Sequence, residues 1–318
     1  MPRPWKITGS QRQAPGSIPV VTDVDLTDEQ AAELDRWCDL LDRLCLAWTS
    51  TAGHLRTLPP STSAAFREDA LVATHRPGWE TNDASNTGRD AAALVDAAAC
   101  HLRGLRSLTR DRAVVLTLWP LARHVAEYAA QAGWLLDPEI TVEQRVARRW
   151  LMKLTNVHRY RQTVASINAS TPTVKIARNL RAQAEHDLLR RFPDAGDLNW
   201  KLENHPQGPP WTLAGQHVPG LGQMVRGFIK IHGFQQGHGM YDMLSLQSHP
   251  NLDVVVASLL EPVQHEGFVQ VGYRVDIPQT TRVLRVAALM FYRAAMAVVS
   301  YFALDPAELN AWYGSLPQ

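Results

Sequence analysis

The chain has 318 residues, of which 45% are hydrophobic and 20% are charged, so it can bury a sizeable core without disulfides or metals. Its 32 basic and 31 acidic side chains leave a formal net charge of +1, which by itself excludes neither a polyanionic nor a neutral partner. Three cysteines without zinc-binding spacing predict a reducing, cytoplasmic location. The sequence opens on no apolar signal core, and its longest apolar run carries Arg293, so we expect no membrane span.

The predicted elements in the first two thirds of the chain are helices, because apolar residues recur at three- and four-residue spacing. Residues 1–26 lack this period and predict an extended N-terminal arm. A capping-box pattern at Thr27 opens the first helix, whereas the polar residues 59–88 predict a long loop, either a lid or a mobile segment. Pro120 is expected to kink the third helix. The expected helices span residues 27–56, 89–108, 111–136, 141–166 and 172–192.

The last third of the chain begins with a second predicted loop, residues 193–219, which is rich in proline. Alternating apolar and polar residues over 267–275 predict one small β-hairpin. Further helices are expected over residues 220–231, 238–249, 251–261, 280–303 and 306–315. The sequence therefore predicts an all-α fold, a multi-helix bundle around a buried central helix, in which residues 27–318 form a single helical domain.

The helix at residues 111–136 is the predicted centre of this bundle, because apolar side chains lie on all of its faces. Between residues 113 and 136 its only acidic or basic side chains, histidine aside, are Arg123 and Glu127, which share a face. Two interpretations stay open. The pair is a structural salt bridge, or a site in which Arg123 presents donors to an anion and Glu127 orients the guanidinium.

A segment unusually poor in charge follows between residues 230 and 253, where Asp242 is the only charged residue. On a helix, four of its side chains fall within about 80° of arc: His238, Tyr241, Ser245 and His249. Neutral donors beside an imidazole suit a cavity in which a proton is transferred. The alternative is that these side chains only satisfy buried backbone groups.

Basic residues gather between residues 145 and 191, where eleven of them stand against two acids. Arg145, Arg148, Arg149 and Arg159 share one side of the predicted helix at 141–166. Such a stripe is typical either of a surface that follows phosphates or of a solvated face that acids from elsewhere neutralise.

Three motifs occur in order: Arg123-x-x-x-Glu127 with Trp134-Leu-Leu-Asp-Pro138, then Arg145-x-x-Arg148, then Tyr241-x-x-Leu-Ser245-x-x-x-His249. Together they resemble a family of uncharacterised helical proteins from high-GC bacteria. Gln144 and Pro250 depart from that family's pattern. The family is similar in style to HEPN proteins, helical dimers that often act as metal-independent RNases.

The resemblance implies a central polar pocket that combines Arg123, Glu127 and Arg145 with Tyr241, Ser245 and His249. In a metal-independent RNase or phosphodiester-cleaving enzyme, His249 would be general acid or base. Arg123 or Arg145 would stabilise the phosphorane charge, and Tyr241 and Ser245 would donate hydrogen bonds. Arg148, Arg149 and His238 are expected to contribute to binding. We expect no metal and no cofactor.

Two other functions stay open. The protein is a non-enzymatic helical protein whose pocket holds a small anionic ligand or a partner segment, or it is a tailoring enzyme that acts on a small molecule. RNA or an anionic small ligand are the expected partners, a homodimer is a possible assembly, and no membrane is expected.

Overall fold

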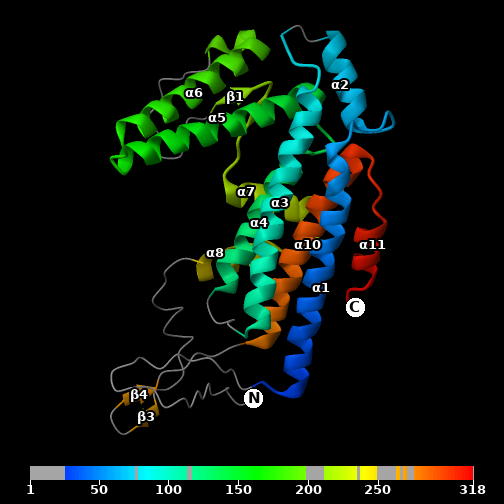
Figure 1. The fold of residues 1–318 in the computed structure, drawn as a ribbon, viewed down its shortest axis with the longest axis vertical. Helices are drawn as coiled ribbons and strands as arrows, with labels where there is room; N and C mark the ends of the chain where they lie inside the picture. The colour runs from blue at the N-terminus through cyan, green and yellow to red at the C-terminus, as the bar shows by residue number, and fades with distance from the viewer. Residues whose placement is uncertain are drawn as a thin grey trace.

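Helix α4 (Leu118–Leu135) is the centre of a helical bundle in the computed structural model (Figure 1). The structure describes residues 26–75, 78–112, 117–197, 211–234, 237–248, 263–265, 268–270 and 276–317. Four helices pack around α4: α3 (Asp83–Arg110), α7 (Leu221–Ile231), α8 (Gly237–Ser248) and α10 (Ile277–Phe302). The predicted all-α bundle is confirmed, and so is the burial of its central helix.

Helix α1 (Asp28–Gly53) covers α3 and α10 on the outside of the bundle, followed by the short 3-10 helix η1 (His54–Arg56). Its N-terminus is fixed as the sequence predicts, because the Gln30 amide donates to Thr27 Oγ1 at 3.2 Å and the Thr27 amide donates to Gln30 Oε1 at 3.1 Å. Helix α11 (Ala307–Gly314) closes the chain against α1.

The segment predicted as a loop at residues 59–88 contains helix α2 (Ala64–His75), and α3 already begins at Asp83, so that prediction is wrong. Ser63 caps α2, since its hydroxyl accepts from the Phe66 amide at 3.1 Å. Ala65 and Val72 are seven residues apart, so they lie on the same face of α2. Both are fully buried, and this face packs α2 on α3 and α10.

Helices α5 (Val142–Ser166) and α6 (Thr171–Arg191) form an antiparallel hairpin that projects from one end of the bundle (Figure 1). Within the predicted loop at 193–219 lie the 3-10 helix η2 (Pro193–Asp197) and a two-stranded antiparallel hairpin, β1 (Thr212–Leu213) with β2 (Gln216–His217). Both strands pack on α5, so the described part of this segment is not a simple loop.

Several other boundaries differ from the sequence prediction. Pro120 occupies the third position of α4, where a helix needs no backbone donor, so it helps to begin the helix and does not kink it. The predicted β-hairpin exists but is shifted, with β3 (Val263–His265) paired to β4 (Phe268–Gln270). The predicted helix at 251–261 and almost all of the arm at 1–26 lie outside the described residues.

Helix α10 is long and apolar enough to cross a membrane by length and composition, with a mean hydropathy of 1.6 over its most apolar window. In the structure, 61% of that window is buried inside the protein. Its apolar side chains pack on α4, α3 and α1, which is the usual environment of a core helix.

The α5–α6 hairpin is joined to the bundle through the buried carboxylate of Asp83, the first residue of α3. Asp83 is fully buried, and its Oδ2 accepts from Arg191 Nε on α6 at 2.6 Å and from the Glu80 amide at 2.9 Å. Arg149 Nη1 on α5 lies 3.6 Å from the other carboxylate oxygen. One carboxylate thus holds a cation from each helix of the hairpin. We call this group of residues the Asp83 joint.

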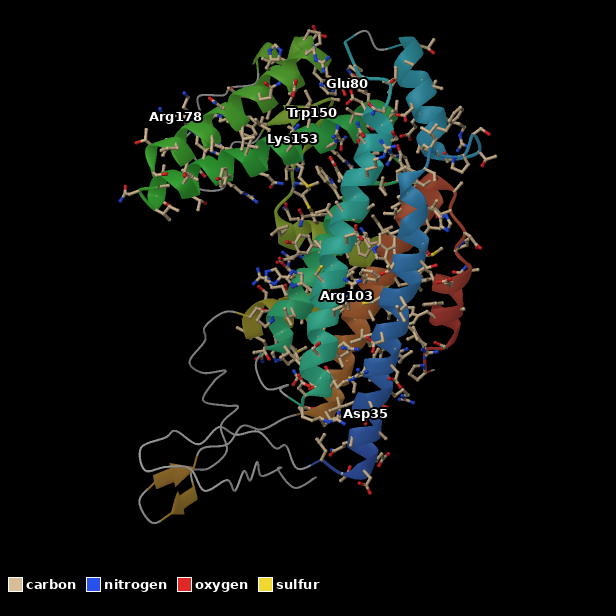
Figure 2. The ribbon with its side chains drawn as sticks, in the orientation of Figure 1. Asp35, Glu80, Arg103, Trp150, Lys153 and Arg178 are labelled. Atoms are coloured by element: carbon tan, nitrogen blue, oxygen red, sulfur yellow. The ribbon has the colours of Figure 1, made fainter. Side chains whose placement is uncertain are left out.

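Aromatic rings and one glycine complete the Asp83 joint. The Trp79 indole donates to the Arg191 carbonyl at 2.6 Å, and the Arg191 guanidinium lies 4.5 Å from the Trp150 ring centroid. Gly78 has φ +93°, and a Cβ there would lie 2.7 Å from the Arg190 carbonyl oxygen, so only glycine fits. Figure 2 shows Glu80 and Trp150 close together at the base of the hairpin.

We predict that Asp83→Asn destabilises the protein by about 3 kcal/mol, because the buried Arg191 guanidinium loses the carboxylate that its Nε binds and keeps only the half-exposed Glu80 as an ion-pair partner. The matched control is Asp90→Asn, whose side chain is 51% exposed and also pairs with Arg149. That exposed pair is worth at most about 1 kcal/mol. Urea unfolding of the three proteins measures both effects. Equal losses for the two variants would contradict a special role for Asp83.

Candidate functional site

The structure brings three of the predicted site residues together at the contact of α4 with α8. Arg123 Nε donates to Glu127 Oε1 at 2.7 Å along α4, and the Tyr241 hydroxyl on α8 donates to the same oxygen at 3.1 Å. Glu127 and Tyr241 are buried, and the Arg123 side chain is 21% exposed. The group therefore ties two helices together around one carboxylate.

The electrostatics of this group favour a neutral tyrosine. Burial raises the pKa of the Tyr241 hydroxyl, and the neighbouring Glu127 carboxylate raises that pKa further. Tyr241 is consequently a fixed hydrogen-bond donor whose proton is directed at Glu127. The Glu127 carboxylate accepts hydrogen bonds from both Arg123 and Tyr241. These contacts by themselves are those of a structural salt bridge, which is the first of the two interpretations that the sequence leaves open.

The remaining residues of the predicted α8 face are less completely described. Ser245 lies one turn beyond Tyr241 in α8 and is half-buried. His238 belongs to the first turn of α8, but its side chain lies outside the described residues, and His249 lies outside them altogether. Their proximity to Glu127 therefore stays a prediction.

Arg145 does not join this cluster, so the predicted six-residue pocket is wrong on this point. Its Nε donates to Glu68 on α2 at 3.1 Å, and its Nη1 donates to the Leu135 carbonyl at the end of α4 at 3.1 Å. Arg123 precedes Leu135 by twelve residues, or about 18 Å along α4. Arg145 is 4% exposed and binds Glu68 together with Tyr301, whose hydroxyl donates at 2.7 Å.

Arg148 completes a connection between the end of α4 and the beginning of α5. Its Nη1 donates to the Trp134 carbonyl at 2.5 Å and lies 3.2 Å from Asp137 Oδ2, while its guanidinium stacks 5.0 Å from the Trp134 ring centroid. Arg145 and Arg148 thus satisfy carbonyls that the end of a helix leaves without partners. Two of the three sequence motifs therefore explain how α5 is attached to α4.

The basic stripe predicted on α5 is consequently divided. Arg145 and Arg148 are buried in ion pairs, and Arg149 pairs with Asp90 at 2.6 Å, so these three are not a continuous phosphate-binding surface. Arg159 is different, because it is exposed and forms no ion pair with the described residues. Asp137 neutralises Arg148, and the acids that neutralise Arg145 and Arg149 come from residues 68–90, which the sequence prediction treated mostly as a loop. The run Ala64-Ala-Phe-Arg-Glu-Asp-Ala-Leu-Val-Ala73, rich in helix-favouring residues, is the signal that could have found them.

Charge remains exposed at the outer half of the α5–α6 hairpin. The 41 residues 144–184 contain no acid. Among the described residues Arg159, Lys175 and Arg178 are exposed and form no ion pair, whereas Arg181 pairs with Glu185 at 2.6 Å. Figure 2 shows Arg178 toward the free end of the hairpin. This group, Arg159, Lys175 and Arg178, is here called the tip cations.

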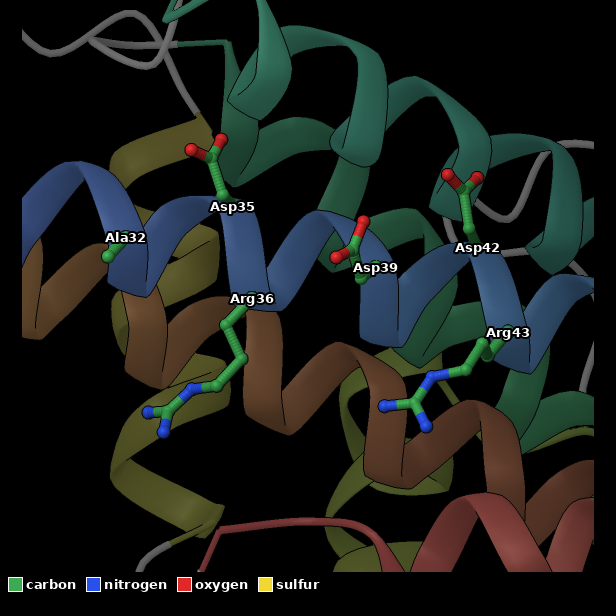
Figure 3. Close-up of a pocket in the computed structure, with 6 residues that line it drawn as sticks. All are labelled: Ala32, Asp35, Arg36, Asp39, Asp42 and Arg43. Atoms are coloured by element: carbon green, nitrogen blue, oxygen red, sulfur yellow. The ribbon is translucent and has the colours of Figure 1, made fainter.

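A wide hollow of about 710 Å³ lies on the outer face of α1, away from the residues predicted to be functional (Figure 3). Two of its acids are neutralised within the protein, since Asp35 pairs with Arg112 at 2.8 Å and Asp42 with Arg106 at 2.7 Å.

Among the described residues no group of three histidine, cysteine or acidic side chains could hold a metal ion.

No family model, curated protein or solved structure matches this chain.

We predict that stability falls as the pH rises above about 10, and that Tyr301→Phe makes this fall shallower. Burial and the adjacent Glu68 raise the pKa of the Tyr301 hydroxyl well above its ordinary value near 10. Above that ordinary value the unfolded chain loses the proton that the folded protein keeps, so unfolding becomes more favourable. Chemical unfolding between pH 8 and pH 11 measures the two slopes. Identical slopes in parent and variant would contradict the assignment.

Proposed function

We propose that this protein binds RNA through the tip cations of the α5–α6 hairpin. The observation that carries the proposal is the division of charge along the hairpin. Cations near its base are paired with carboxylates of the bundle, and the tip cations in its outer half are exposed and form no ion pair with the described residues. Unpaired, clustered cations on a projecting element are typical of surfaces that contact phosphates.

The arrangement of the tip cations suits a phosphate backbone. Arg159 precedes the end of α5 by seven residues, and Arg178 follows the start of α6 by seven. In an antiparallel hairpin these positions lie at the same level, and Lys175 lies about one turn closer to the end. Two adjacent helices thus present three cations to a polyanion. No acid occurs among residues 144–184 that would repel the phosphates. The similarity in style to HEPN proteins favours RNA among the polyanions.

The exposed apolar side chains of the hairpin lie on a different face. On α6, Ile176 and Leu180 are 55% and 48% exposed, and helical projection places them roughly 150° from Lys175 and Arg178. RNA bound to the tip cations would leave this apolar face uncovered. The proposal therefore concerns the basic face alone.

The double variant Lys175→Ala/Arg178→Ala is expected to weaken RNA binding roughly tenfold near 0.1 M salt, because two exposed contacts to phosphates are lost. The slope of log affinity against log salt should fall by about 2, which is close to one unit for each lost contact. Fluorescence anisotropy with a labelled RNA at several salt concentrations measures both quantities.

The control for this experiment is Arg36→Ala on α1, which removes an exposed arginine that is paired with Glu33. It should bind RNA as the parent does. Equal weakening by the control, or no RNA binding by the parent even at low salt, would contradict the proposal. Tighter binding of duplex DNA than of RNA would move the preference to DNA.

RNA cleavage is a separate prediction, and it rests on α8. If His249 transfers a proton, His249→Ala should lower the cleavage rate about 10²–10⁴-fold with an unchanged melting temperature. Ser245→Ala should cost far less, since a neutral hydrogen bond contributes only about 1 kcal/mol. A cleavage assay paired with thermal melting measures both effects. Activity loss that merely follows destabilisation would assign His249 a structural role, and a parent that cleaves no RNA would leave binding as the function.

A further inference from the structure

Ion pairs join α1 and α3 along only one half of the contact between the two helices. Just past the middle of α1, Asp42 pairs with Arg106 at 2.7 Å and with Arg110 at 3.1 Å. In the second half, residues 43–56 contain no acid, although α3 continues to present arginines there. The arginines of this half consequently meet no carboxylate of α1.

A cleft of about 400 Å³ lies in this unmatched half. Small and apolar residues of α1, η1 and α3 line it, so the backbones of the two long helices stay accessible there: Ala52, Gly53, Leu55, Ala92 and Ala93. Arg89 and Arg103 stand at its two ends, and Asp96 stands between them.

The two arginines have hydrogen-bonding capacity to spare. Arg103 donates to the Thr49 hydroxyl at 3.3 Å, and Arg89 donates to the Asn86 side-chain oxygen at 3.0 Å. Neither forms an ion pair with the described residues, although Arg89 lies near Asp69, where burial raises the pKa of the carboxyl and the charge of Arg89 partly opposes that rise. The Asp96 carboxylate accepts a hydrogen bond from the Trp48 indole at 2.7 Å.

The spacing of these three charges indicates which kind of ligand would fit the cleft. Arg89, Asp96 and Arg103 follow each other at intervals of seven residues, so they lie on one face of α3 about 10.5 Å apart. The two arginines are therefore about 21 Å apart, which is longer than a compact small molecule that would fill the cleft. A helix with acid, base and acid at the same seven-residue intervals would match all three charges.

We propose that the cleft between α1 and α3 is a docking site for an amphipathic helix of a partner protein, with acidic, basic and acidic residues at seven-residue spacing. The small residues of the cleft let this helix approach both walls closely. Its carboxylates pair with Arg89 and Arg103, and its basic residue pairs with Asp96. A second copy of the same α3 face does not fit, because either orientation would place arginine against arginine.

The test uses a synthetic 17-residue helical peptide with glutamate at positions 2 and 16 and lysine at position 9. Leucine or alanine at positions 5, 6, 12 and 13 forms its apolar face. We expect the full-length protein to bind this peptide in fluorescence anisotropy and to bind the charge-reversed peptide at least about tenfold more weakly. Arg89→Ala and Arg103→Ala should each weaken binding of the first peptide about fivefold, the upper limit for exposed pairs.

Two variants separate this site from the others. Ala93→Phe, at an exposed position, fills the cleft without changing charge and should abolish peptide binding with an unchanged melting temperature. Lys175→Ala/Arg178→Ala should bind the peptide as the parent does while losing RNA affinity, so the two proposals fail independently. Absence of binding, equal binding of the charge-reversed peptide, an Ala93→Phe variant that still binds, or full competition by inorganic phosphate would overturn the helix-docking proposal.

Discussion

The buried carboxylate of Asp83 is the constraint on which the arrangement of this protein depends. A fully buried charge is tolerated only when it is paired and hydrogen-bonded, and Asp83 meets this requirement with cations from α5 and α6. The same contacts fix the projecting hairpin against the start of α3. Neutralisation of this carboxylate and attachment of α6 to the bundle are therefore one interaction, while Arg145 and Arg148 attach α5 to the end of α4. Trp150, with Arg191 4.5 Å from its ring centroid, adds packing at the same place.

This constraint explains why basic residues so close in sequence have different environments. Arg148 and Arg191 lie at the base of the hairpin, where carboxylates of the bundle and free carbonyls of α4 bind them. Arg159 and Arg178 lie in the outer half, beyond the reach of those acids. Basic residues spread along both helices of the hairpin thus form an uneven surface, on which the tip cations are exposed and form no ion pair with the described residues.

Sequence patterns predicted the central helix and most of the helices around it, because α1 carries apolar periodicity behind a capping box at Thr27, and α4 and α10 are strongly apolar. They also placed Arg123 and Glu127 on one face, where the structure finds an ion pair. They did not predict α2, because its fully buried apolar positions, Ala65 and Val72, are few and its larger apolar residues, Phe66 and Leu71, are exposed and give no buried face. The grouping of Arg145 with Arg123 was wrong because spacing along one helix contains no information on which neighbouring helix supplies the acid.

We expect the Asp83 joint to hold the hairpin in a fixed position relative to the bundle. Spin labels on the exposed Cys100 and on Asn168→Cys at the hairpin turn would report the distance between the two parts by pulsed electron paramagnetic resonance. We expect one narrow distance distribution for the otherwise unchanged protein and a broad one when Asp83→Asn is added. A broad distribution before that substitution, or a narrow one that the substitution does not alter, would contradict it.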